Sequence, residues 1–225
     1  VLDTGTALTV DAGYGNSGLV RYAAAQEVQG TEQVIDASGR AYVGLIRGDP
    51  GSASATGLLL RLTAAGAIDT SFGTGGVLTL AGTPSRAWGV GMDGNGVVQV
   101  VGSAGGATGE RPTITYIDPT TGVLDSVRLE FGTIFPAYPR AEYNAVVPLA
   151  GGGALAVGAV YTAAQRSHAM VTRLAGGRRT VDLIEYFHAG FGHYFITGIA
   201  QEIAALDSGA LPGWARTGQS TSALP

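Results

Sequence analysis

One aromatic segment near the end of the chain, LIEYFHAGFGHYFITG, carries the side chains best suited to chemistry. His188 and His193 flank a four-residue turn and could face each other across a hairpin. Together with Glu185 or Glu202 they could form a metal site. Two histidines without a fixed third ligand are a weak metal pattern, and we favour the alternative, a structural hydrogen bond from His193 within an aromatic cluster. We therefore expect no metal and no cofactor.

The same region is rich in rings that could stack on a sugar. The aromatic residues are Tyr186, Phe187, Tyr194, Phe195 and Trp214. Aromatic faces with a polar rim suit glycan binding, whereas alternate residues of a strand would instead form a small hydrophobic core. The sequence leaves both interpretations open. Trp214, close to Arg216, is the ring that we most expect to be exposed.

Nucleophilic catalysis finds little support in the sequence. Ser167 and His168 are neighbours, which gives no triad geometry. The sequence closest to G-x-S-x-G starts at Gly102 and has the wrong spacing. We predict no catalytic residues and no enzyme activity in this chain.

Composition excludes several classes of protein. The net charge is −4 and the only basic doublet is Arg178–Arg179, so a nucleic-acid surface is not expected. Cysteine is absent, which excludes disulfides and thiolate metal sites. The uncharged stretch 143–165 is long enough to span a bilayer, but it contains Pro148 and three consecutive glycines. We expect two strands around a turn there and no membrane span.

A repeat is the main organising signal. The segments DAGYGNSGLV, DTSFGTGGVL and DSVRLEFGTI begin at Asp11, Asp69 and Asp125, which are 58 and 56 residues apart. The first two fit D-x-x-aromatic-G-x-x-G, and in the third the Phe-Gly comes three residues late. Asp11 and Asp69, like Asp93, lack a dense D-x-D-x-D loop, so we expect them to cap turns rather than bind calcium.

An inner pattern repeats with the same period. Three strand–turn–strand segments align around Gly39, Gly96 and Gly153, spaced by 57 residues each time. A further strand and a glycine-containing turn follow each segment. Each unit therefore holds about four strands in roughly 57 residues, which is typical of a propeller blade.

Three longer loops fall at the same edge of the predicted blades. They span 46–56, 103–111 and 159–168, and insertions on one edge often form a binding face. These loops carry Arg47, Asp49, Glu110, Arg111, Tyr161, Arg166 and His168. Arg111 and Arg166 are our candidate ligand-binding residues there.

The repeat region, about 11–175, resembles the bacterial delta-sixty repeat, a β-propeller-like family of surface and secreted proteins. The resemblance rests on LLRLTAAGAIDTSFGTGGVLTL and GVGMDGNGVVQVVGSAGG and is weakest in the third unit, where Ala150 stands in the position of Asp36 and Asp93. It implies a propeller and a secreted or cell-surface location. Three blades do not close a ring, so we expect the chain to be part of a longer protein.

The segment after Val181 resembles a small repeat of unknown function appended to secreted bacterial proteins. Its signature is E-Y-[YF]-x(4–6)-H-[YF]-[YF]-x-T, an acidic helix and G-W-x-R-x-G. The matching residues are Glu185, Tyr186, Phe187, His193, Tyr194, Phe195, Thr197, Glu202, Gly213, Trp214, Arg216 and Gly218. Because some relatives lie beside cell-wall hydrolases, the resemblance implies attachment to the cell envelope or to a glycan.

The predicted fold is all-β, with three four-stranded propeller-like blades followed by a small α+β module. The blades cover residues 1–178, as units of about 11–68, 69–124 and 125–178, and the module covers 179–225. The predicted function is non-enzymatic binding or scaffolding outside the cytoplasm, with an envelope glycan or protein as partner. Two alternatives remain, an accessory region of a secreted hydrolase and a structural spacer. The candidate binding residues are Trp214, Arg216, Tyr186, His188, His193, Tyr194, Arg111 and Arg166.

Overall fold

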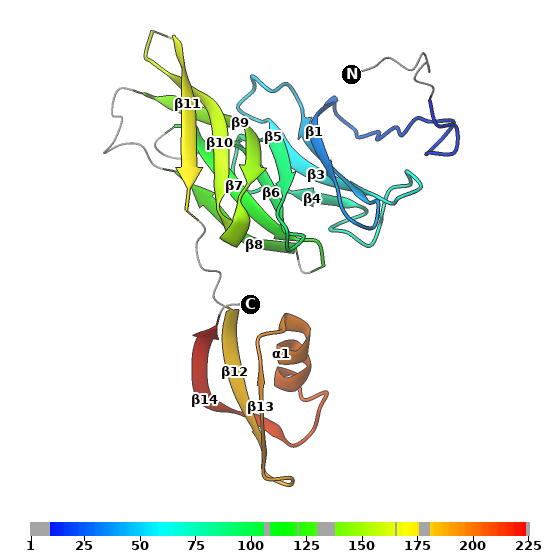
Figure 1. The fold of residues 1–225 in the computed structure, drawn as a ribbon, viewed down its shortest axis with the longest axis vertical. Coiled ribbons are helices and arrows are strands. Elements are labelled where there is room, and N and C mark those ends of the chain that lie inside the picture. Colours follow the sequence, from blue (N-terminus) through cyan, green and yellow to red (C-terminus); the bar gives the residue numbers. More distant parts are fainter. Residues whose placement is uncertain are drawn as a thin grey trace. The chain divides into compact units, whose positions relative to one another are not determined.

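The chain is an all-β protein with one short helix, as the computed structural model in Figure 1 shows. The structure describes residues 10–105, 109–120, 122–129, 138–164, 166–175 and 181–223. It forms two compact units, Val1–Ala175 and Gly176–Pro225. Four antiparallel sheets make up these units, and the first unit does not close into a ring within the described ranges.

The first unit holds three sheets whose strands follow one another in chain order. The first sheet contains β1 (Val28–Ile35), β2 (Ala41–Arg47), β3 (Thr56–Leu62) and β4 (Val77–Thr79). The second contains β5 (Ser85–Met92), β6 (Val98–Ala104), β7 (Arg111–Asp118) and β8 (Gly122–Arg128). The third contains β9 (Arg140–Pro148), the turn η1 (Ala150–Gly152), β10 (Ala154–Tyr161) and β11 (Ser167–Leu174). Where four strands were expected, the third sheet therefore has three among the described residues.

The second unit has one sheet and the helix. Its elements are β12 (Val181–His188), β13 (His193–Thr197), α1 (Ala200–Asp207) and β14 (Trp214–Ala223). The strand order is β13-β12-β14, with antiparallel neighbours.

The period predicted from the inner pattern is confirmed in the turn geometry, with a shift of one residue in the third sheet. Gly39 and Gly96 have φ of 79° and 80°, and the third residue of this kind is Gly152, with φ of 81°. Gly153 is extended, so its predicted equivalence to Gly39 was wrong. The run of three glycines concealed the correct alignment, since each of them could fill the left-handed position.

The turns that open with Asp11 and Asp69 are the same structure. In both, an aspartate Oδ1 accepts a backbone N–H two residues later, at 2.9 Å and 3.2 Å, which confirms turn capping. Four further backbone hydrogen bonds recur 58 residues apart: Tyr14 N–Asp11 O with Phe72 N–Asp69 O, Gly18 N–Tyr14 O with Gly76 N–Phe72 O, Asn16 N–Leu19 O with Thr74 N–Val77 O, and Leu19 N–Asn16 O with Val77 N–Thr74 O. Asp125 instead lies inside β8, so the third predicted start was wrong. The Phe131-Gly132 pair lies outside the described residues.

A bulge opposite a glycine is built into the second and third sheets. The register of β5 and β6 shifts at Trp88, and that of β9 and β10 shifts at Asn144. Gly102 and Gly158 lie opposite these bulges, and a Cβ on either would approach the carbonyl oxygen of Arg86 or Glu142 to 1.9 Å. Only a residue without a side chain therefore fits there.

Successive sheets pack face to face through their first strands. The core joins Tyr42 and Leu59 of the first sheet to Val90 and Val100 of the second. The opposite face of the second sheet packs on the third sheet in the same way, through Val101, Ile114, Tyr116, Tyr143 and Val146. We call the face of a sheet that lies against the following sheet its receiving face. Each first strand thus covers the receiving face of the sheet before it.

The described part of the uncharged stretch, 143–164, contains two strands around the turn η1, as predicted. In the part of the chain that the structure describes, no helix is both long and apolar enough to cross a membrane.

Replacing Gly102 by alanine should destabilise the first unit by about 2–3 kcal/mol, because the methyl group would overlap the carbonyl of Arg86. Gly94→Ala is the matched control, since a Cβ at Gly94 meets no atom within 4 Å. Urea unfolding followed by circular dichroism measures both. Equal midpoints for the two variants would contradict the packing described here.

Candidate functional site

The second unit buries one face of its sheet under α1. Tyr186 of β12 is 1% exposed and Leu206 of the helix is 4% exposed. The helix begins where Thr197 Oγ1 accepts the N–H of Ile199 at 3.0 Å and donates to Glu202 at 2.5 Å. It ends before Gly209, whose φ of 75° suits a residue without Cβ. A short helix therefore lies between β13 and β14, with a glycine just beyond its end.

Tyr186 and Arg216 are held together by Asp207, at the end of the helix. Asp207 Oδ1 accepts from the Tyr186 hydroxyl at 2.9 Å and from Arg216 Nε at 2.8 Å. Burial, and then the hydrogen bond to Asp207, raise the pKa of Tyr186. The hydrogen bond from Arg216 lowers the pKa of Asp207. These groups fasten the helix to the sheet, so two of the predicted binding residues are engaged in structure.

Four rings gather on the helix side of the sheet, near the turn between β12 and β13. We call His188, Phe191, Phe195 and Trp214 the aromatic cluster. The His188 ring stacks on Phe191 with centroids 4.0 Å apart and meets Trp214 edge-on at 5.2 Å. Phe195 meets Trp214 at 5.8 Å. A Cβ on Gly213 would lie 2.2 Å from His188 Nε2, so glycine at this position lets the histidine sit against β14.

Exposure within this unit differs from the prediction. Trp214 is half-buried, whereas Phe191 is 68% exposed and Tyr194 is 63% exposed. Tyr194 lies on the other face of the sheet and packs on Phe187, with ring centroids 4.8 Å apart. Phe191 was not among the predicted binding residues, although its place in the tight turn Gly190-Phe191-Gly192 is typical of an exposed ring.

The histidines do lie opposite each other, since His188 and His193 are paired in the register of β12 and β13. His188 Nδ1 accepts the backbone N–H of Phe191 at 3.2 Å, so this nitrogen is already used. Among the residues with described positions, no group of three His, Cys, Asp or Glu side chains could hold a metal ion.

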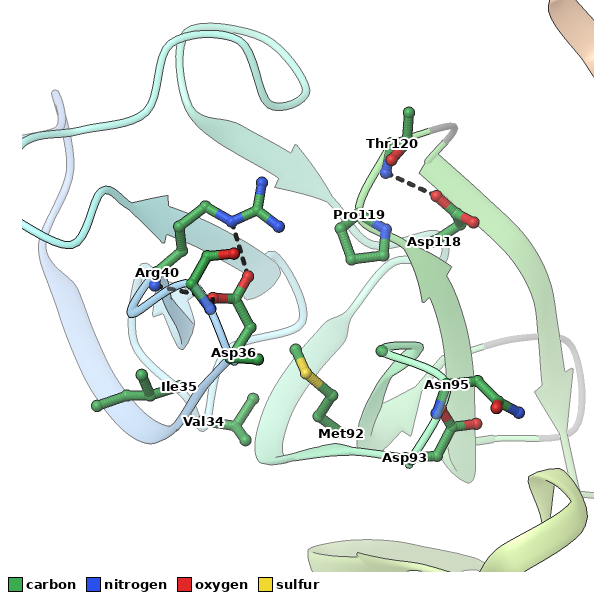
Figure 2. A pocket seen from close by; sticks show the side chains of 14 residues that line it. Val34, Ile35, Asp36, Arg40, Met92, Asp93, Asn95, Asp118, Pro119 and Thr120 are labelled. Carbon is green, nitrogen blue, oxygen red and sulfur yellow. Dashed lines mark hydrogen bonds and ion pairs between the residues drawn. The ribbon is translucent and has the colours of Figure 1, made fainter.

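A hollow in the first unit lies where three turns meet (Figure 2). The β1–β2, β5–β6 and β7–β8 turns supply Asp36, Asp93 and Asp118, and Val34 and Met92 form the apolar part of its lining. Each aspartate caps its own turn: Asp93 Oδ1 accepts from Asn95 N at 2.9 Å, and Asp118 Oδ1 accepts from Thr120 N at 2.6 Å. The hollow is wide and open, and its carboxylates already stabilise turns.

Asp36 is the most fully bonded of the three. Its Oδ1 accepts from Ser38 N at 2.8 Å and Arg40 N at 2.9 Å, and its Oδ2 accepts from Arg40 Nε at 2.7 Å. Burial by itself would raise the pKa of Asp36, but the hydrogen bonds from Arg40 and Ser38 outweigh it, and the pKa lies below its ordinary value.

The predicted loop edge contains a chain of ion pairs between the second and third sheets. Arg86 pairs with Glu110, whose other oxygen lies 3.4 Å from Arg140 Nε. Arg140 also pairs with Glu142 at 2.8 Å, and Glu142 accepts from the Tyr161 hydroxyl at 2.6 Å. The hydrogen bond to Glu142 raises the pKa of Tyr161. Two arginines and two glutamates balance each other here.

At this loop edge, two buried arginines donate hydrogen bonds to carbonyl groups of neighbouring loops. Arg86, 3% exposed, donates to the carbonyls of Pro50 and Ser52 in the β2–β3 loop. Arg111 donates to Pro139 O at 2.7 Å and is also buried. Arg166 is exposed at the β10–β11 turn. Of the two loop residues predicted to bind a ligand, Arg111 therefore has a structural role. Arg166 stays a candidate binding residue only because it is exposed.

In comparisons with known proteins, no family model matches the chain and no curated protein sequence matches it.

Replacing Arg86 by lysine should destabilise the first unit by about 2 kcal/mol, because an ammonium cannot serve both loop carbonyls and Glu110 at once. Arg166→Lys, at an exposed position, should stay within about 0.5 kcal/mol of the wild type. Guanidinium unfolding compares the two. The interpretation fails if the two lysine variants are equally stable.

Asp36 should make the first unit sensitive to acid. Because the folded pKa lies below the unfolded one, its stabilisation is present above the unfolded pKa of about 3.9 and is lost as the pH falls through the folded pKa. Asp36→Asn keeps an acceptor for the two backbone N–H groups but removes the charge, so its stability should depend less on pH as the pH falls from about 5 to about 2. Asp49→Asn, where the carboxylate caps Gly51 at 2.8 Å, is the control. Melting temperatures measured across this pH range test the prediction. If the melting temperatures of the wild type and Asp36→Asn fell in parallel with pH, the proposed stabilisation of the Asp36 carboxylate by Arg40 would be contradicted.

Proposed function

We propose that this chain is a non-enzymatic repeat protein that binds or scaffolds outside the cytoplasm, and that its aromatic cluster is the binding surface. The observation that carries the proposal is the contrast inside the second unit. Asp207 and Arg216 pair with each other, and Glu185 and Glu202 accept from threonine hydroxyls. Phe191, in contrast, is largely exposed and stacks on His188, which also meets Trp214. The surface offered to a ligand there is aromatic.

The first unit has the scaffold role in this proposal. Its sheets are interpreted as propeller-like blades of the delta-sixty type. Support comes from the 58-residue recurrence of the Asp11 and Asp69 turns, the recurring bulge opposite glycine, and the way in which each first strand packs on the preceding sheet. Such repeats present a rigid, extended surface.

The favoured ligand is a cell-envelope glycan. Trp214 lies two residues before Arg216, which pairs with Asp207. The apolar face of a sugar could stack on such a ring while its hydroxyl groups bind the neighbouring charged groups. A protein partner with an exposed aromatic or proline side chain would use the same rings, and this is the second candidate.

Phe191→Ala should weaken binding to purified bacterial cell-wall polysaccharide about three- to tenfold, since one stacked ring is worth about 0.5–1.5 kcal/mol. Phe191 is mostly exposed, so the second unit should fold normally in this variant. Tyr194→Ala, on the opposite face of the sheet, is the matched control and should bind like the wild type. Co-sedimentation with insoluble polysaccharide and a glycan array provide the readout. No binding by the wild type to any glycan would leave the glycan proposal without support, and equal losses in both variants would remove the aromatic cluster as the site.

A further inference from the structure

The third sheet ends at an unpaired edge. In the first sheet β3 pairs with β4, and in the second β7 pairs with β8. Within the described ranges, β11 pairs with β10 alone. One edge of β11 therefore presents backbone N–H and C=O groups that a further strand could pair with.

In the part of the chain that the structure describes, no sheet covers the face of the third sheet that corresponds to the receiving faces of the first two. Register and spacing place Val157 and Val171 in the positions of Val101 and Ile114 of the second sheet. Val101 and Ile114 are 0% and 1% exposed beneath the third sheet, whereas Val157 and Val171 are 40% and 68% exposed. Val147 and Leu155 extend the same apolar face. A face built for a following sheet lies open to solvent.

At the other end of the first unit, residues 11–22 are equivalent to the segment that supplies the outer strand of the first sheet. Residues 11–19 repeat four backbone hydrogen bonds of residues 69–77, and the turn at 69–76 leads into β4. By this 58-residue spacing Leu19, Val20 and Arg21 take the places of Val77, Leu78 and Thr79, which pair with β3. Leu19 is 66% exposed and no strand pairs with it in the part described. The segment is an outer strand without a sheet of its own, and Val20 packs on the first sheet.

Among the described residues, Arg173 and Tyr14 also lack the partners that their equivalents have in the first sheet. In the first sheet Arg61 pairs with Asp69 at 2.9 Å and lies 4.7 Å from the ring centroid of Phe72. Arg173 occupies the position of Arg61 in the third sheet, since each is paired with the equivalent residue of the preceding strand. Asp11 and Tyr14 occupy the positions of Asp69 and Phe72. Both charged residues are exposed, and their charges are opposite.

These two halves lie at opposite ends of the first unit, with β11 and the N-terminal segment far apart in Figure 1. One chain therefore does not join them. A second copy supplies both halves at once. The first unit of each copy has three described sheets, so two copies give six. Six is the only multiple of three within the range of about four to eight blades seen in closed propellers.

We propose that two copies of this chain associate head to tail, the segment Leu19–Arg21 of each copy adding an outer strand to β11 of the other. The pairing copied from β3 and β4 sets Leu19 opposite Thr172 and Val20 opposite Val171. Arg173 then pairs with Asp11 of the other copy and stacks on its Tyr14. This proposal does not depend on the glycan proposal, because it uses another unit of the chain.

A charge exchange tests the ion pair. Light scattering after size exclusion, at several concentrations, should give a dimer for the wild-type chain. Arg173→Asp should weaken the dimer at least about tenfold by placing two carboxylates together. The double variant Asp11→Arg with Arg173→Asp should restore it. Arg166→Asp, an exposed arginine outside the interface, should leave the dimer unchanged. A wild-type chain that stays monomeric, or a double variant that stays dissociated, overturns the proposal and assigns the open face to another partner.

Engineered cysteines test the strand register without depending on stability. The natural chain has no cysteine. Leu19→Cys with Thr172→Cys should give an intermolecular disulfide under mild oxidation, since paired residues on antiparallel strands have Cα atoms about 4.5–5.5 Å apart. Leu19→Cys with Val123→Cys uses an exposed site on β8 and should not cross-link. Equal cross-linking of both pairs overturns the proposed register.

Discussion

The structure of the first unit depends on one constraint: the first strand of each sheet must lie across the face of the preceding sheet. Backbones can approach this closely only where the side chain is missing. A Cβ on Gly57 would meet the backbone of Ala87 at 3.0 Å, and one on Gly89 would meet Ala145 at 2.8 Å. The high glycine content of the chain is therefore partly explained by sheet-to-sheet contact as well as by turns. The same constraint defines a receiving face on every sheet, including the third, where no sheet among the described residues covers it.

Arginine, which supplies all 13 of the Lys and Arg residues in this chain, also connects the sheets. Arg61, Arg86 and Arg111 each reach carbonyl oxygens that belong to another loop or sheet. A guanidinium offers several donors in a fixed plane, so one side chain can hold a carboxylate and a distant carbonyl together. Arg61, for example, binds Asp69 in the β3–β4 loop and donates to the carbonyl of Pro119 in the β7–β8 turn at 2.7 Å. These arginines connect the sheets through polar contacts while the apolar core fills the space between them.

The second unit divides its polar and aromatic side chains between two roles. Asp207 binds both Arg216 and Tyr186, and these hydrogen bonds fasten the helix to the sheet. The Thr217 hydroxyl donates to Glu185 at 2.7 Å and so connects β14 to β12. Packing leaves Phe191 exposed and Trp214 partly exposed on the helix side. A surface made of rings with paired charges nearby suits recognition by stacking, which is the basis of the proposed binding function.

The sequence by itself determined what depends on local chemistry. The turns at Asp11 and Asp69, the hairpin at Asp93 and the two strands around the glycines at 151–153 follow from residues within a few positions of each other, so spacing alone predicts them. Only the tertiary structure decided the roles of Tyr186 and Arg111, which looked like ligand residues, because their partners Asp207 and Pro139 are distant in sequence. The same holds for the alignment at Gly152, where three adjacent glycines satisfy any register until the strand pairing selects one. A residue type states which bonds a side chain can form, but the packing of distant segments determines which of those bonds are already taken.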